Sequence, residues 1–170
     1  MEEWVVKWQY IAVIGLGWAV AQFIKAIGIV ASRRAEVVDV KNLNKTTLAR
    51  KFWRALWISG GMPSSHTSIV VSTALYIGLV NGFTSAIFGL ALCFAVVVIY
   101  DAVNVRYAVG MNALTLNKVI KHGSMKVDTV KVVKGHTVAE AIGGFFVGVL
   151  VGFFAFWLFG GDFSSIFATL

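Results

Sequence analysis

The sequence predicts an all-α integral membrane protein, with about four transmembrane helices and one further helix in the membrane interface. Its 170 residues are 58% hydrophobic and only 14% charged, whereas about 25% of the residues in a soluble domain are charged. The mean hydropathy is +0.81, and several apolar runs approach the roughly 20 residues that a helix needs to cross a bilayer. Because the chain has one proline and no proline-rich linker, we expect residues 1–170 to form a single membrane-embedded domain.

Four apolar runs predict the membrane-spanning helices. They extend from Tyr10 to about Ala31, from just after His66 to Gly82, from Ser85 to Tyr100, and from Val138 to Phe159. We expect the third helix to continue through Asp101 and Asn104, and residues 81–84 to form the tight hairpin that joins the second and third helices.

Residues 47–57 have the pattern of a helix that lies in the membrane interface. Leu48, Phe52 and Leu56 recur every four positions, while Arg54 falls on another face. Such an apolar face beside a basic face suits the boundary between headgroups and acyl chains. A solvated basic loop is the alternative interpretation of this region.

The basic residues predict the orientation of the chain in the membrane. Seven lie between the first and second apolar runs and six between the third and fourth, so 13 of the 15 Lys and Arg residues share one side. These residues are Arg33, Arg34, Lys41, Lys45, Arg50, Lys51, Arg54, Arg106, Lys118, Lys121, Lys126, Lys131 and Lys134. Because cytoplasmic loops carry such an excess, we expect both termini on the outer side of the cell membrane. The net charge of +7 is then a topology signal, and a nucleic-acid partner is not expected.

Unusual polar residues cluster at the expected cytoplasmic ends of the helices. They are Lys25, the segment Gly60–His66, the group Asp101, Asn104 and Arg106, and the group Gly135, His136 and Glu140. Charged residues inside a membrane are costly and are usually retained for function. The sequence therefore predicts a polar site at the cytoplasmic face.

The segment before the second helix resembles an anion-binding helix start. We expect Pro63 in the first turn, where its missing N–H costs nothing, and Ser64 or Ser65 as the cap. The free N–H groups of that turn would bind an anion, and His66 would lie beside it. The alternative is an ordinary glycine turn and cap, with His66 facing water.

Two further groups of polar residues suggest roles in the same site. His136 and Glu140 are four residues apart and share a helix face, so the carboxylate can orient the imidazole for use as a base or nucleophile. An exposed pair at a helix start is the alternative. Asp101 and Asn104 also share a face, and we expect them to support the site through an ion pair that fixes helix register.

Phosphoryl transfer to histidine suits this set of residues. Cations and helix N–H groups would hold the phosphate oxygens, while one histidine attacks phosphorus and the other protonates the leaving alcohol. A zinc site built from His66, His136 and Glu140 is the competing interpretation, but it leaves the adjacent cations unexplained. We therefore expect neither a metal nor another cofactor.

Three segments resemble the divergent branch of the phosphatidic acid phosphatase type 2 superfamily, which is related to acid phosphatases and vanadium-dependent haloperoxidases. They are Gly60–His66, Asp101–Arg106 and Gly135–Glu140, and the similarity in order and spacing extends from Gln22 to about Gly152. The resemblance implies metal-independent cleavage of a phosphomonoester or pyrophosphate.

The resemblance also implies residue roles. Pro63, Ser64 and His66 match the Pro-Ser-Gly-His motif of the superfamily, with Ser65 in place of glycine. His136 and Glu140 match the His-x3-Asp part of its Ser-Arg-x5-His-x3-Asp motif. By this resemblance His136 is the nucleophile, His66 the general acid, and Glu140 the residue that orients His136.

The basic positions depart from the superfamily pattern. The Lys-x6-Arg-Pro motif has no counterpart here, and Val130 stands where the arginine six residues before the second histidine is expected. We expect Lys25, Arg54 and Arg106 to hold the phosphate instead. Further substrate contacts are expected from Ser64, Ser65 and Gly135.

The expected function is a membrane lipid-phosphate phosphatase that acts through a phosphohistidine on a phospholipid or isoprenoid phosphate. A carrier or flippase for lipid phosphates is one alternative, and a catalytically inactive lipid-binding protein is another. Gly144, Gly148 and Gly152 recur at four-residue spacing and indicate a close-packing helix face. This face would pack within the monomer or form a homodimer.

Overall fold

The computed structural model describes residues 2–31, 53, 56, 61–123, 127–133 and 135–161, with side chains of the first helix described from Trp8 to Ile29. Within these residues the fold is all-helical and contains no strand. The elements are α1 (Glu2–Ala31), α3 (Ser65–Asn81), α4 (Ala86–Tyr100), the π-helix η2 (Asp101–Val105), α5 (Arg106–His122) and α6 (Val138–Leu158).

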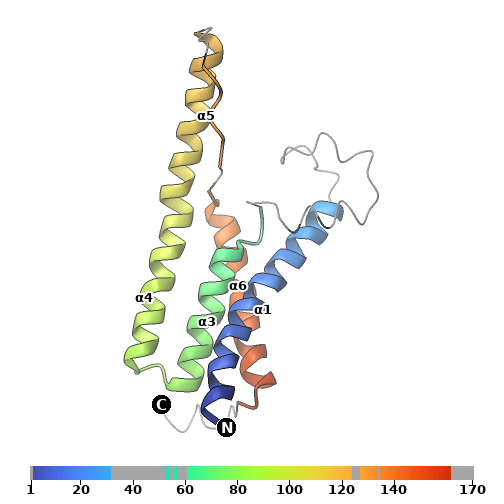
Figure 1. Ribbon diagram of the computed structural model, residues 1–170, viewed down its shortest axis with the longest axis vertical. Coiled ribbons are helices and arrows are strands. Elements are labelled where there is room, and N and C mark those ends of the chain that lie inside the picture. The colour runs from blue at the N-terminus through green and yellow to red at the C-terminus, as the bar shows by residue number, and fades with distance from the viewer. Residues whose placement is uncertain are drawn as a thin grey trace.

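Helix α3 is the centre of the bundle. It packs against α6, α1 and α4, and α1 also packs against α6. Figure 1 shows α3 between α4 on one side and α1 on the other. Its buried side chains contribute to two apolar clusters, one around Tyr76 and Phe156 and one around Val70 and Ala95. The position of α3 explains why its buried residues include many small polar side chains, which allow three neighbouring helices to approach closely.

The glycine face of α6 packs on α3 within the monomer. A Cβ atom added at Gly148 would lie 2.8 Å from the carbonyl oxygen of Ser68, and one at Gly152 would lie 3.1 Å from that of Ser72. At Gly144 it would clash with the carbonyl oxygen of Ser64. The close-packing face predicted from the spacing is therefore covered by α3. A homodimer stays a prediction, but this face is already occupied in the monomer.

This packing predicts a difference between two Gly→Ala substitutions. Gly144→Ala should lower the free energy of unfolding by roughly 1–3 kcal/mol, because the added methyl group forces α3 and α6 apart. Gly89→Ala on α4 is the matched control, since an added Cβ atom meets no other atom within 4 Å there. Thermal unfolding of both variants in detergent measures the effect. Equal unfolding temperatures would contradict the packing argument.

Three helical stretches are long and apolar enough to cross a membrane, and they identify a membrane protein. They are Trp8–Ile29, Ala86–His122 and Val138–Leu158. Helix α3 has 17 residues, which is the lower limit for a crossing. Four spans and two outer termini therefore remain predictions.

The long helix differs from its expected form. Helices α4, η2 and α5 form one continuous stretch of 37 residues, so the third predicted helix continues well beyond Asn104. Gly123 ends it, with its N–H donating to the Val119 carbonyl oxygen. The hairpin before it forms as predicted: Gly82 has a φ of 85°, and the side chain of Ser85 accepts from the Phe88 N–H.

The predicted interfacial helix lies mostly outside the described residues. Trp53 and Leu56 are described, and both are helical. Arg54 and Gly60 lie outside the described part of the chain.

Candidate functional site

The predicted site residues come together at one end of the bundle. Lys25 lies toward the end of α1, His66 in the first turn of α3, Arg106 at the start of α5, and His136 just before α6. In Figure 1 these helix ends lie on the side away from the beginning of α1 and the end of α6. Residues more than 100 positions apart in sequence therefore share one end of the molecule.

Glu140 holds the imidazole of His136 in one orientation. Its Oε2 atom lies 3.1 Å from Nδ1 of His136 and also accepts from the backbone N–H of Thr137 at 3.1 Å. A carboxylate only accepts hydrogen bonds, so Nδ1 carries the proton and the lone pair of a neutral ring lies on Nε2. His136 is buried, with 6% of its surface exposed. The lone pair on its Nε2 atom therefore has a fixed orientation.

The start of α6 is a capping box. The Thr137 side chain accepts from the Glu140 N–H at 3.3 Å, while the Glu140 carboxylate accepts from the Thr137 N–H. This reciprocal arrangement satisfies two N–H groups that a helix start leaves unpaired. Glu140 thus stabilises the helix start and orients His136 with the same carboxylate oxygen. The Thr-x-x-Glu pattern was visible in the sequence, although the role of Thr137 was not predicted.

The π-helix η2 provides the docking point for His136. The His136 N–H donates to the carbonyl oxygen of Ala102 at 3.0 Å, and Gly135 lies directly against the backbone of Arg106 and Tyr107. A π-turn alters the hydrogen-bond register of a helix and often occurs at functional sites. Glycine is required at position 135 because a Cβ atom there would clash with this backbone. Sequence reasoning did not predict η2, because residues 101–105 carry no distinct π-helix pattern.

Ser64 connects the starts of α3 and α6. It is fully buried, and its side chain caps α3 by accepting from the Thr67 N–H at 3.4 Å. Its backbone N–H donates to the Glu140 carbonyl oxygen at 2.9 Å. Pro63 lies one residue before this cap, so its predicted place in the first helical turn is wrong. Ser65 takes the first helical position and is also buried.

The two histidines face a shared region. Their ring centroids lie 6.0 Å apart, with the ring planes at 60°. His66 is exposed, in contrast to His136. Arg106, Lys25 and Asp101 act on His66 electrostatically. The two rings are close enough for one phosphoryl group to contact both.

Lys25 is an unusual buried cation. Only 2% of its surface is exposed, and its side chain packs beside Gly61, where an added Cβ atom would lie 3.8 Å from Lys25 Cδ. It also interacts electrostatically with Glu140. A buried ammonium group needs compensating negative charge, and both Glu140 and a bound phosphate would supply it.

The η2 region places a second cation at the site. Arg106 Nε donates to Asp101 Oδ2 at 2.5 Å, and both side chains are partly exposed. This is the ion pair that the sequence suggested for Asp101, which had Lys25 and a histidine as alternative partners. Asn104 is exposed and donates to the Tyr100 carbonyl oxygen at 3.3 Å.

Gln22 makes a polar contact that was not predicted from the sequence. Its Nε2 donates to the Leu56 carbonyl oxygen at 2.6 Å, and the side chain is buried. This bond connects α1 with the chain that leads toward Gly61. A buried glutamine three residues before Lys25 on a membrane helix was the available signal.

The described residues do not provide a set of ligands for the alternative zinc site. Among the residues that the structure describes, no group of three or more His, Cys, Asp or Glu side chains is placed to hold a metal ion.

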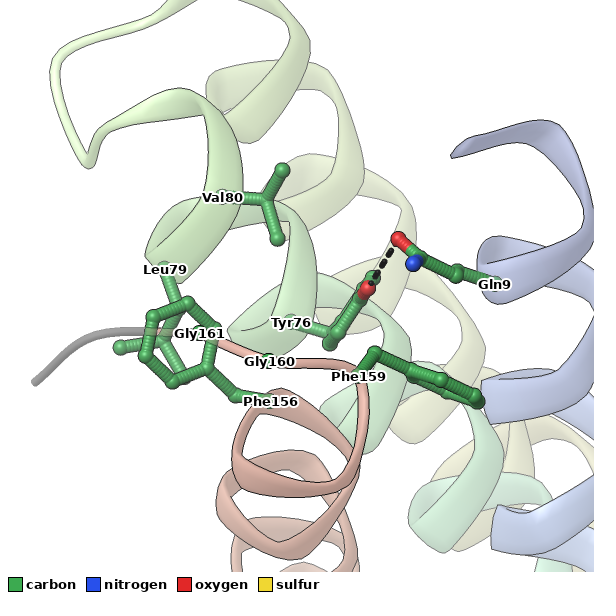
Figure 2. Close-up of a pocket in the computed structure, with 8 residues that line it drawn as sticks. All are labelled: Gln9, Tyr76, Leu79, Val80, Phe156, Phe159, Gly160 and Gly161. Atoms are coloured by element: carbon green, nitrogen blue, oxygen red, sulfur yellow. Dashed lines mark hydrogen bonds between the residues drawn. The ribbon is translucent and has the colours of Figure 1, made fainter. Parts of the chain in front are cut away.

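A cavity lies at the end of the bundle opposite to the candidate site. It measures about 240 Å³ and is lined by residues that include Gln9, Tyr76 and Phe159. Figure 2 shows the Tyr76 hydroxyl donating to Gln9 Oε1 at 2.9 Å beside this cavity. None of the predicted site residues lines it.

Comparisons with known proteins identify the family of the chain. The model of the "Divergent PAP2 family" matches residues 6–151. A 68-residue segment is 35% identical to "Uncharacterized membrane protein YuiD" of Bacillus subtilis (strain 168), covering 40% of this chain and 43% of that relative. No solved structure matches the chain. The family match covers most of the chain and includes all three site segments, so this protein belongs to the divergent PAP2 family.

Proposed function

We propose that the protein is a metal-independent lipid-phosphate phosphatase that works through a phosphohistidine. The observation that carries this proposal is the pairing of His136 with Glu140 at 3.1 Å, with the His66 ring 6.0 Å from the His136 ring. Membership of the PAP2-related family supports a phosphatase-type hydrolase. The burial of Lys25 beside this pair adds a cation suited to an anionic substrate.

In the first step, His136 Nε2 attacks phosphorus and the P–O bond to the lipid alcohol breaks. His66, in its protonated form, gives its proton to the leaving alcohol oxygen. Lys25, Arg106 and the N–H groups at the start of α3 stabilise the negative charge on the phosphoryl oxygens. Glu140 stabilises the positive charge that develops on the His136 ring.

In the second step, water attacks the phosphohistidine. His66, now neutral, accepts a proton from the water, and the P–N bond breaks to release inorganic phosphate. His136 returns to its starting state, still bonded to Glu140. The cycle consumes one water molecule and returns every protein proton to its starting position.

The position of the site supports a lipid substrate. The histidines lie at helix ends in a membrane protein, where a phosphate headgroup meets cations while its hydrocarbon chain stays in the bilayer. We therefore assign a phospholipid or isoprenoid phosphate, at the cytoplasmic face of the cell membrane, as the substrate. Lys25, Arg54 and Arg106 are the proposed phosphate-binding cations.

The direct test is phosphate release from lipid phosphates by the purified protein in detergent, with a chelator present. Phosphatidic acid, phosphatidylglycerol phosphate and an isoprenyl phosphate should be compared. We expect turnover of at least one of them without added metal. Strict dependence on an added metal would refute the mechanism.

The role of Glu140 predicts the behaviour of Glu140→Gln. The amide keeps the size of the side chain but removes the charge that stabilises the His136 cation, so kcat should fall by on the order of 10²–10⁴-fold. KM should change much less, because the phosphate ligands are retained. Steady-state kinetics measure both parameters. The matched control is Glu140→Asp, which restores the carboxylate of the superfamily motif and should recover part of kcat.

A further inference from the structure

One face of α3 is only partly covered by the other helices. Between Ser64 and Gly78, the positions that are not buried are His66, Ile69, Thr73, Leu75 and Ile77. All except Leu75 follow a spacing of three or four residues and share one helix face. Val80 continues the same spacing and is 42% exposed. We call the set of His66, Ile69, Thr73, Ile77 and Val80 the α3 stripe.

The neighbouring helices flank the α3 stripe without closing over it. On one side, Gly17 of α1 packs against Ile69 and Ser72. On the other side, Ala95 of α4 packs in the cluster that contains Val70. Figure 1 shows α1 leaning away from α3 toward the end that carries the histidines. The α3 stripe therefore lies between α1 and α4, and its central members Ile69, Thr73 and Ile77 are partly exposed.

The α3 stripe runs directly into the candidate site. Its first member is His66, whose charged neighbours include Arg106 and Lys25. Its remaining members are aliphatic apart from Thr73. A surface that is cationic at one end and apolar along the rest is complementary to a molecule with an anionic headgroup and a long hydrocarbon chain.

From this continuity we infer that the α3 stripe binds the hydrocarbon chain of the lipid phosphate whose headgroup contacts His66. The inference rests on the proposed function and adds the route by which substrate arrives: sideways from the bilayer, between α1 and α4. Ile77 lies 11 positions after His66, or about 16 Å along the helix axis. Only a long chain reaches that far.

The test is Ile77→Trp, assayed with two substrates that share a headgroup and differ in chain length. The larger side chain should lower kcat/KM for a dioleoyl phosphate by about tenfold, because it obstructs the distal half of the chain. It should leave a dihexanoyl phosphate within about twofold of the parent protein, because that chain ends before Ile77. Equal losses on both substrates, or no loss on either, would overturn the inference.

Leu90→Trp provides the matched control. Leu90 is 71% exposed on α4 and lies 11 positions before Asp101, at a similar distance from the site on an antiparallel helix. Its replacement adds the same bulk at a similar depth but away from the α3 stripe. The Leu90→Trp variant should turn over both substrates as fast as the parent protein does. A long-chain defect as large as that of Ile77→Trp would show that general disturbance of the bilayer contact is responsible.

A second measurement needs no turnover and no variant. A non-hydrolysable phosphonate lipid with a photoreactive diazirine near its chain end should label α3 around Thr73 and Ile77. A diacylglycerol with the same diazirine should label α4 and α6 instead, because it lacks the anionic headgroup. Identical labelling by both probes would mean that bulk lipid covers the α3 stripe. Absence of activity with both dihexanoyl and dioleoyl substrates, with selective labelling retained, would count against the proposed phosphatase and leave the binding inference standing.

Discussion

Replacement of His136 by alanine should abolish phosphate release, with kcat reduced by at least about 10³-fold. Removing a nucleophile eliminates the covalent pathway itself, so the loss is expected to be larger than for any other single substitution in this site. The proposed attacking atom is Nε2 of His136, because Nδ1 is hydrogen-bonded to Glu140. The measurement is single-turnover phosphate release in detergent.

The covalent intermediate provides a second measurement for the same variant. The parent protein, quenched in base during turnover of a radiolabelled lipid phosphate, should retain label on a peptide containing His136. The label should be lost in acid, because the P–N bond of phosphohistidine is acid-labile. His122→Ala is the matched control, since His122 is exposed at the end of α5 and should leave activity and labelling unchanged. Robust turnover by His136→Ala would refute the mechanism.

Replacement of His66 by alanine should produce a loss that depends on the leaving group. For a lipid phosphate, which has an alkoxide leaving group, the single-turnover rate of phosphohistidine formation should fall by roughly 10²–10⁴-fold because the general acid is missing. For an aryl phosphate such as p-nitrophenyl phosphate, the leaving group departs without a proton, and the rate of this first step should fall much less. Hydrolysis of the phosphohistidine, in which His66 accepts a proton from water, should slow equally for both substrates. The ratio of the two losses in the first step reports the role of His66 as the acid.

The same pair of substrates distinguishes the two histidines. His136→Ala should lose activity toward both, because the nucleophile is required regardless of the leaving group. A His66→Ala variant in which phosphohistidine formation slows equally with both substrates would indicate that His66 binds phosphate rather than donating a proton. Unfolding temperatures close to that of the parent protein would show that neither loss comes from misfolding.

Local sequence patterns identified much of the fold and part of the site. The apolar runs located α1, α4 and α6, and Gly82 with Ser85 located the hairpin. The His136–Glu140 contact was also expected from the four-residue spacing, although His136 lies just before α6 and reaches the carboxylate oxygen that completes the capping box. A serine cap at Ser64 or Ser65 followed from the same kind of local rule, and the structure places it at Ser64.

Contacts between distant segments could not be predicted in this way. His66 and His136 are 70 positions apart, and their 6.0 Å separation depends on how α3 and α6 pack. The bond from the His136 N–H to Ala102 depends on the π-turn of η2. The length of the third helix was underestimated because the charged residues after Tyr100 suggested an early end, whereas α5 continues to His122.

The sequence by itself determined that this chain is a helical membrane protein with histidines, a carboxylate and cations at helix ends, because hydropathy and helical spacing are properties of short segments. Only the tertiary structure decided that α3 is the central helix, that the glycine face of α6 is covered by it, and that the α3 stripe beside His66 is partly exposed. These features arise from close packing between helices, where the absence of a single Cβ atom determines which faces meet.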